Sequence, residues 1–168
     1  MAYAITTPYI GAPVFTDTDT TKKVPLGTLA RGFDSTYGEG EFIYLLGVAS
    51  TEVGSVVIYN TTTWQTALVT VTNGKNKGLP VAVAMAANLA SNYGWYQVSG
   101  NAVVKKTGVS VNPGVPVFIS ATSGRVKVLA SAGQQVLGAS TANLTTIVTT
   151  TSTVVVSINR RQAQGQIT

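Results

Sequence analysis

The chain has 168 residues, enough for one domain with a sizeable core, and 45% of them are hydrophobic while only 10% are charged. This composition argues against intrinsic disorder and against a long helical bundle, whose exposed faces would carry many Glu and Lys. The chain contains no Cys and no His. Disulfides, imidazole catalysis and thiolate- or His-ligated metal sites are therefore excluded.

The net charge is +5, and all six carboxylate side chains fall before residue 53. The basic residues beyond that point are scattered, without a dense basic run, so solubility and orientation explain them better than nucleic-acid binding. No stretch reaches 18 apolar residues, and the opening lacks the basic start and long apolar run of a signal peptide. We therefore expect neither a nucleic-acid partner nor a membrane.

Residues 1–38 have weak periodicity and contain Pro8, Pro13 and Pro25 together with the polar run 16–21. Each proline removes an amide donor and disfavours helix at the residue before it. We expect this segment to be an extended N-terminal arm that buries too little to stay ordered alone. Its apolar residues would then be received by a partner surface: Tyr3, Ile5, Tyr9, Ile10 and Phe15.

From Glu41 the pattern changes to short runs rich in β-branched residues and broken by turn residues. Strands are predicted at 41–48, 53–60, 64–72, 81–86, 93–98, 102–106, 115–120, 125–129 and 153–159, with weaker runs at 135–139 and 144–149. A loop is expected at 73–78, a helical turn at 88–92 and a hairpin at Ser99-Gly100-Asn101. The sequence thus predicts an all-β domain over 39–159, a small β-barrel or β-sandwich, followed by a short loose polar tail at 160–168.

Few residues suggest chemistry. Glu39 and Glu41, two apart on a predicted strand, share a face, but nothing else in the sequence indicates a cleft, so pairing with basic residues or amides is the better interpretation. Asp17 and Asp19 lack the further acids of a calcium loop. No phosphate-binding glycine motif occurs. We expect no enzymatic activity, no metal and no cofactor.

Five short runs stand out along the chain: 26–34 (LGTLARGFD), 37–45 (YGEGEFIYL), 83–88 (VAMAAN), 93–97 (YGWYQ) and 114–117 (GVPV). In these motifs the sequence resembles the decoration (cement) proteins of tailed bacteriophage capsids, and the likeness covers most of residues 26–158. The resemblance implies a capsid-exterior protein of the virion, a homotrimer or sometimes a dimer, that clamps neighbouring major capsid proteins. It implies a small β-barrel or β-sandwich with extended arms and no catalytic residues.

The predicted contacts with the shell or a neighbouring protomer are Tyr3, Ile5, Tyr9, Ile10 and Phe15 of the arm and Glu41, Phe42 and Tyr44 of the first strand. Deleting residues 2–15 is expected to abolish capsid binding and leave the barrel folded. Two alternatives stay open. One is a tail or fibre component with a glycan-binding face around Trp64, Trp95 and Tyr96, and the other is a basic barrel that binds single-stranded nucleic acid.

Overall fold

The computed structural model describes residues 3–5, 13–160 and 162–165. Its elements confirm the all-β prediction, since one short helix accompanies twelve strands of a single antiparallel sheet. The elements are β1 (Ala4–Ile5), β2 (Thr18–Asp19), β3 (Leu29–Asp34), β4 (Gly38–Leu46), β5 (Val56–Tyr59), β6 (Thr66–Leu68), α1 (Val71–Gly74), β7 (Val81–Ala84), β8 (Tyr93–Lys105), β9 (Pro116–Ile119), β10 (Val126–Lys127), β11 (Gln135–Thr141) and β12 (Thr153–Asn159).

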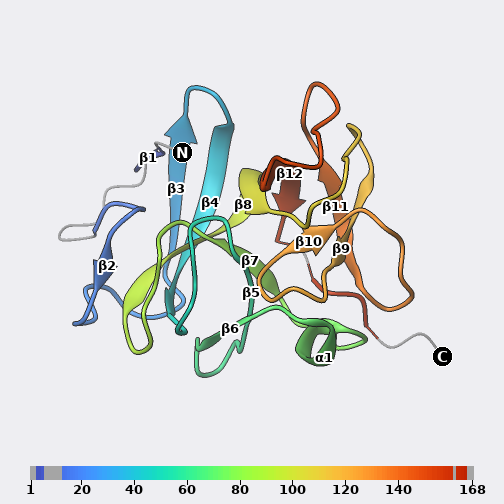
Figure 1. Ribbon diagram of the computed structural model, residues 1–168. Coiled ribbons are helices and arrows are strands. Elements are labelled where there is room, and N and C mark those ends of the chain that lie inside the picture. Colours follow the sequence, from blue (N-terminus) through green and yellow to red (C-terminus); the bar gives the residue numbers. More distant parts are fainter. Residues whose placement is uncertain (1–2, 6–12, 161, 166–168) are drawn as a thin grey trace.

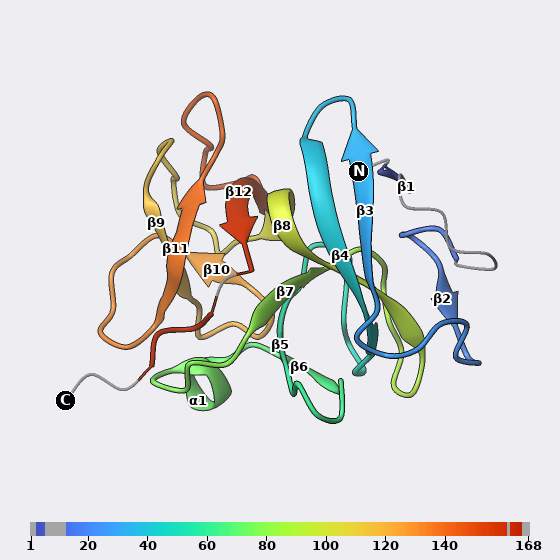
Figure 2. The ribbon, with the colours of Figure 1, turned by 180° about the vertical axis from the view of Figure 1, so that it is seen from behind.

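The longest strand, β8, joins the two sides of the molecule. Its first half pairs with β4 and also with β2 and β7, and its second half pairs with β12. The main path of the sheet runs β1-β3-β4-β8-β12-β11-β9-β10, while β5 and β6 branch from β7. Figures 1 and 2 show β1 to β4 on one side of β8 and β9 to β12 on the other. The strand pairing is that of an open sheet, so the finer barrel or sandwich prediction is not established by it.

The predicted hairpin at residues 99–101 is wrong, because β8 continues through it. Gly100 does adopt a positive φ of 95°, yet the chain bulges there instead of turning back. The register with β4 shifts between Glu41 and Phe42, which pair with Ser99 and Gln97. The buried Gln97 amide nitrogen lies within hydrogen-bond distance of the Ser99 and Asn101 carbonyls, at 3.0 and 3.2 Å. A glycine conformation that permits a turn thus serves a bulge that redirects the strand.

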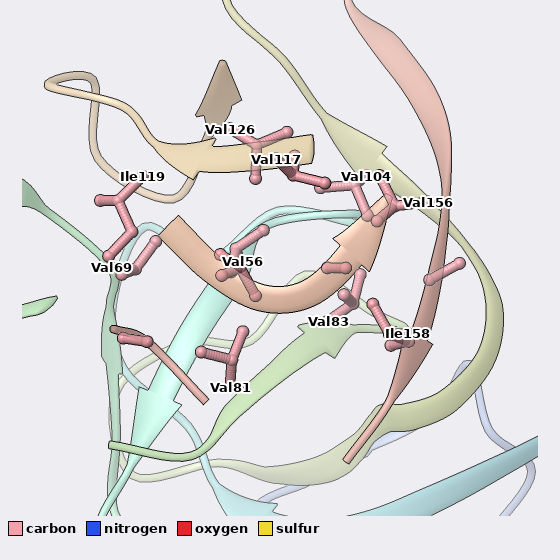
Figure 3. Close-up of a cluster of buried hydrophobic side chains, with 14 of the residues drawn as sticks. Val56, Val69, Val81, Val83, Val104, Val117, Ile119, Val126, Val156 and Ile158 are labelled. Atoms are coloured by element: carbon pink, nitrogen blue, oxygen red, sulfur yellow. The ribbon is translucent and has the colours of Figure 1, made fainter. Parts of the chain in front are cut away.

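The described residues form three clusters of buried side chains. The largest is aliphatic, and Figure 3 shows its valines and isoleucines converging from β5, β7, β8, β9, β10 and β12. The second is aromatic and contains Tyr3, Phe15, Phe42, Tyr44 and Trp95. The third packs Tyr96 against residues of β4, β5 and β7. The predicted inward face of residues 153–159 is confirmed, because Val154, Val156 and Ile158 are all buried.

The N-terminal segment is more integrated than an arm. Residues 29–34 form β3, which pairs with β4 over six positions. Phe15 is 1% exposed and Val24 is 8% exposed. The sequence did not indicate this packing of the N-terminal segment, because the buried residues of the segment are far apart and follow no single period. Tyr9 and Ile10 lie outside the described residues.

Three smaller predictions need correction. The predicted strand at 64–72 ends at Leu68, because Thr70 caps the short helix α1 by accepting from the Asn73 amide while the Asn73 side chain accepts from the Thr70 amide. No helix forms among residues 88–92. The tail is docked over part of its length, since Ala163 is fully buried and exchanges a bridge with Val136. Across the described ranges, no helix has the length and apolar character that a membrane span requires.

Candidate interaction surfaces

The segment that contributes β11 and β12 carries no charged side chain. Residues 128–159 include no Asp, Glu, Lys or Arg. Four large apolar side chains of this stretch are nevertheless exposed: Leu129, Leu137, Leu144 and Val148. Because uncharged surface loses little hydration energy on burial, this region is suited to a contact with another protein.

The loop between β11 and β12 presents the most exposed of these residues, Leu144, at 98% exposure. The loop is fixed by backbone bonds, since Val111 and Ile147 exchange two hydrogen bonds of 2.9 Å each. The Asn143 side-chain amide donates to the carbonyls of Val111 and Thr145, at 3.3 and 2.6 Å. Figure 1 shows this loop projecting in the same direction as the β3–β4 turn. An apolar side chain on an ordered loop binds with a smaller entropic cost than one on a mobile loop.

A groove of about 210 Å³ lies on the other side of the molecule. Tyr59 and Trp64 line it and stack on each other, with ring centroids 6.4 Å apart and planes inclined by 23°. Leu29 and Ile43 contribute apolar lining, and Arg160 contributes a charged group. The residues come from β3, β4, the end of β5, the β5–β6 connection and the residue after β12, so the groove depends on the tertiary fold.

An ion-paired cluster adjoins this groove. The Arg160 Nε donates to one oxygen of Glu41 at 2.8 Å, and an Arg31 Nη lies 3.4 Å from the other oxygen. The hydrogen bond from Arg160, followed by the charges of both arginines, holds the pKa of Glu41 below its ordinary value. A second depression lies beside these ion pairs. It is lined by Arg31, Glu39, Glu41 and Ser99. The prediction that the acids meet basic residues is confirmed for Glu41.

Two further acids, Asp34 and Glu52, have partners within the fold. Asp34 accepts hydrogen bonds from the amides of Thr36 and Tyr37, at 2.8 and 3.1 Å. Glu52 pairs with Lys105. Within the part of the chain that the structure describes, no three acidic, His or Cys side chains gather closely enough to hold a metal ion.

One buried cation serves the fold. Lys106 is 1% exposed, and its Nζ donates to the carbonyls of Val109 and Thr107 at 2.7 and 3.3 Å. Burial lowers the pKa of this amine, because the charged form loses hydration. Its partners are backbone carbonyls of its own loop, so this lysine holds the chain after β8 in place.

Four of the eight predicted contact residues lie in the interior. Tyr3, Phe15, Phe42 and Tyr44 are at most 8% exposed, and they pack against one another and Trp95. Ile5 is partly buried against the same cluster, whereas Glu41 reaches the surface within its ion pairs. Packing within the chain accounts for the apolar character of the first four. A contact with a partner through any of the eight residues stays a prediction.

The predicted glycan-binding face is wrong in two of its three residues. Trp95 and Tyr96 are both fully buried, on opposite faces of β8. Trp64 alone is partly exposed. Sequence reasoning missed both the groove, whose parts are distant in the chain, and Leu144, whose only signal was an apolar residue within a polar, uncharged run.

No protein-family model matches this chain, and no curated protein matches it.

Proposed function

We propose that the chain is a non-enzymatic structural protein of a bacteriophage virion that binds the outside of the capsid and cements neighbouring major capsid protein subunits. The resemblance of its β-strand motifs to capsid decoration proteins suggests this role. The observation that carries it is the uncharged surface of residues 128–159, with Leu144 fully exposed on a loop fixed by hydrogen bonds. Such a surface favours adhesion, because burying it costs little desolvation.

The proposal includes self-association as a homotrimer, with a dimer as the alternative, and a barrel-like or sandwich-like closure of the strands around the aliphatic cluster. Many copies on one shell convert weak individual contacts into firm attachment. The net charge of +5 favours approach to an acidic shell exterior. The arm contacts through Ile5, Tyr9 and Ile10 belong to the same proposal, as does the absence of nucleic-acid and membrane partners.

Cosedimentation with undecorated capsids tests this function. The wild-type chain is expected to bind, and Leu144→Asp is expected to weaken binding by about tenfold or more, because the partner would have to bury a charge. Leu89→Asp is the matched control, since Leu89 is 67% exposed but lies outside the uncharged stretch. Failure of the wild type to bind capsids would remove the proposal, and equal effects of the two substitutions would remove the role of the β11–β12 loop.

A further inference from the structure

The groove beside Tyr59 and Trp64 contains an unusual backbone feature. Among the described residues other than glycine, five have a positive φ, and three of these are Ser or Asn. The other two are Trp64, at 59°, and Arg160, at 49°. Bulky residues rarely adopt this region, which costs of order 1–3 kcal/mol each. Both line the same groove.

Local structure explains how the chain holds Trp64 in this conformation. The Asn60 side-chain oxygen accepts from the amides of Thr62 and Thr63, at 2.7 and 2.9 Å. The Trp64 amide in turn donates to the Asn60 carbonyl at 2.9 Å. Gly27 leaves room for the indole, because a Cβ at this position would lie 2.6 Å from Trp64. The turn, the glycine and the strained residue together place the indole beside Tyr59.

The charges next to the groove cancel. Glu39 and Glu41 provide two negative charges, and Arg31 and Arg160 provide two positive charges. Two positive and two negative side chains together give no net attraction for a polyanion such as nucleic acid. It offers a dense array of hydrogen-bond donors and acceptors, because a guanidinium has five N–H groups and a carboxylate accepts about four bonds. The chemical complement is a neutral ligand with many hydroxyl groups.

The aromatic side chains of the groove also suit a ligand with many hydroxyl groups, if that ligand is a sugar. A pyranose ring presents C–H groups on its face and hydroxyl groups at its edge, and aromatic faces carry negative charge that attracts C–H groups. We propose that this groove binds a neutral oligosaccharide, with one sugar ring against Tyr59 and Trp64 and the hydroxyl groups of the next on Arg160, Glu41 and Arg31. Glu39 and Ile43 are four residues apart on β4, so the two depressions span roughly 13 Å at about 3.3 Å per residue.

Titration of the full chain with neutral hexasaccharides of glucose, mannose, galactose and N-acetylglucosamine tests this site. Tryptophan fluorescence reports binding, because the chain has two tryptophans and Trp95 is fully buried. At least one hexasaccharide is expected to bind with a dissociation constant of about 1 mM or lower. Backbone amide shifts in NMR spectra are expected to change around residues 59–64 and at Arg160.

Two substitutions locate the binding. Tyr59→Ala and Arg160→Asn are each expected to weaken it by about tenfold, and asparagine is chosen because it tolerates a positive φ. Tyr59→Phe keeps the stacked ring and is expected to retain binding. Leu129→Ser, at an exposed position in the uncharged stretch, is the control and is expected to bind as the wild type does.

Three results would overturn the saccharide site. The first is the absence of any response up to about 10 mM of every sugar, a concentration at which even weak sites are occupied. The second is binding that Tyr59→Ala and Arg160→Asn leave unchanged. The third is self-association of the chain that Tyr59→Ala abolishes, which would assign the groove to a second copy. The saccharide site does not depend on capsid binding. The outcome of the capsid cosedimentation experiment and the outcome of the saccharide titration are therefore independent.

Discussion

The two largest cores of the protein consist of different kinds of side chain, since one is aliphatic and the other is built on aromatic rings. On the side of β9 to β12, the core consists of valines, isoleucines and alanines, and β12 supplies its share by regular alternation. On the side of β1 to β4, the core is built on Tyr3, Phe15, Phe42, Tyr44 and Trp95. Aliphatic cores spread their stability over many small contributions, whereas aromatic cores concentrate it in a few large rings.

The aromatic core also depends on the N-terminal segment. Phe15 stacks on Phe42 with centroids 3.9 Å apart and meets Trp95 edge-on at 5.4 Å. The Trp95 indole nitrogen donates to the Pro13 carbonyl at 3.1 Å, across 82 residues of sequence. The residues before β3 therefore complete a core and are not separable from it, which makes this side of the molecule the more vulnerable to single changes.

The largest effect is expected for Phe15→Ala, which removes the ring between Phe42 and Trp95. The loss of free energy of unfolding should be about 3–5 kcal/mol, the usual cost of emptying a buried aromatic site. Urea denaturation followed by circular dichroism measures it. Val14→Ala is the neighbouring control, because Val14 is 53% exposed, and it should cost less than about 0.5 kcal/mol. Similar values for the two variants would show that Phe15 is not part of this core.

The same contacts revise the expectation for deleting residues 2–15. That truncation removes Tyr3 and Phe15 and is now expected to destabilise the fold, so a loss of capsid binding by the truncated chain would not identify a contact. A single substitution at Leu144 avoids this ambiguity, since that side chain makes no contribution to either core.

A slightly smaller effect is expected for Gly100→Ala, at the bulge where β8 passes from one core to the other. Its Cβ would meet the Glu39 carbonyl oxygen at 2.3 Å, and its φ is 95°. We expect a cost of about 3 kcal/mol from strain and displacement of β4. Gly114→Ala is the matched control, since φ is 71° there and nothing lies within 4 Å. The control variant should lose about 1–2 kcal/mol of unfolding free energy from backbone strain alone. Equal losses for the two variants would mean that β4 moves away from the added methyl group at little energetic cost.

Val156→Ala probes the aliphatic core and should cost less than Phe15→Ala. Two methyl groups are worth about 1.6 kcal/mol of lost burial, and the residual cavity adds to this. Thermal unfolding should therefore show a loss of about 2 kcal/mol. Val155→Ala, at the adjacent and less buried position of β12, should cost less. A loss at Val156 as large as that at Phe15 would remove the contrast between the two cores.

Sequence reasoning located parts of the aliphatic core correctly but missed the aromatic core. The alternation of Val154, Val156 and Ile158 located β12 to the residue, because a strand with one buried face shows a period of two. The aromatic core was missed, since Phe15 and Phe42 belong to segments with no common periodicity. At Gly100, a conformation suited to a turn was used for a bulge, and only the partner strand β4 decides between these outcomes. The groove of Tyr59, Trp64 and Arg160 is likewise a product of long-range contacts.

The smallest effect concerns the ion pairs of Glu41, which link β3 through Arg31 to the residue after β12, Arg160. Because these partners lower the pKa of Glu41 in the folded state, they stabilise the protein above the ordinary glutamate pKa of about 4.3. This contribution is lost as pH falls through the lowered value. Glu41→Gln should therefore be less stable than the wild type by about 0.5–1 kcal/mol at pH 7, as is usual for partly exposed pairs, and the difference should vanish in strong acid. The exposed Glu39→Gln variant serves as control. If the stability difference between Glu41→Gln and the wild type did not change with pH, the substitution would act through packing. The ion pairs of Glu41 would then not join the two sides of the molecule.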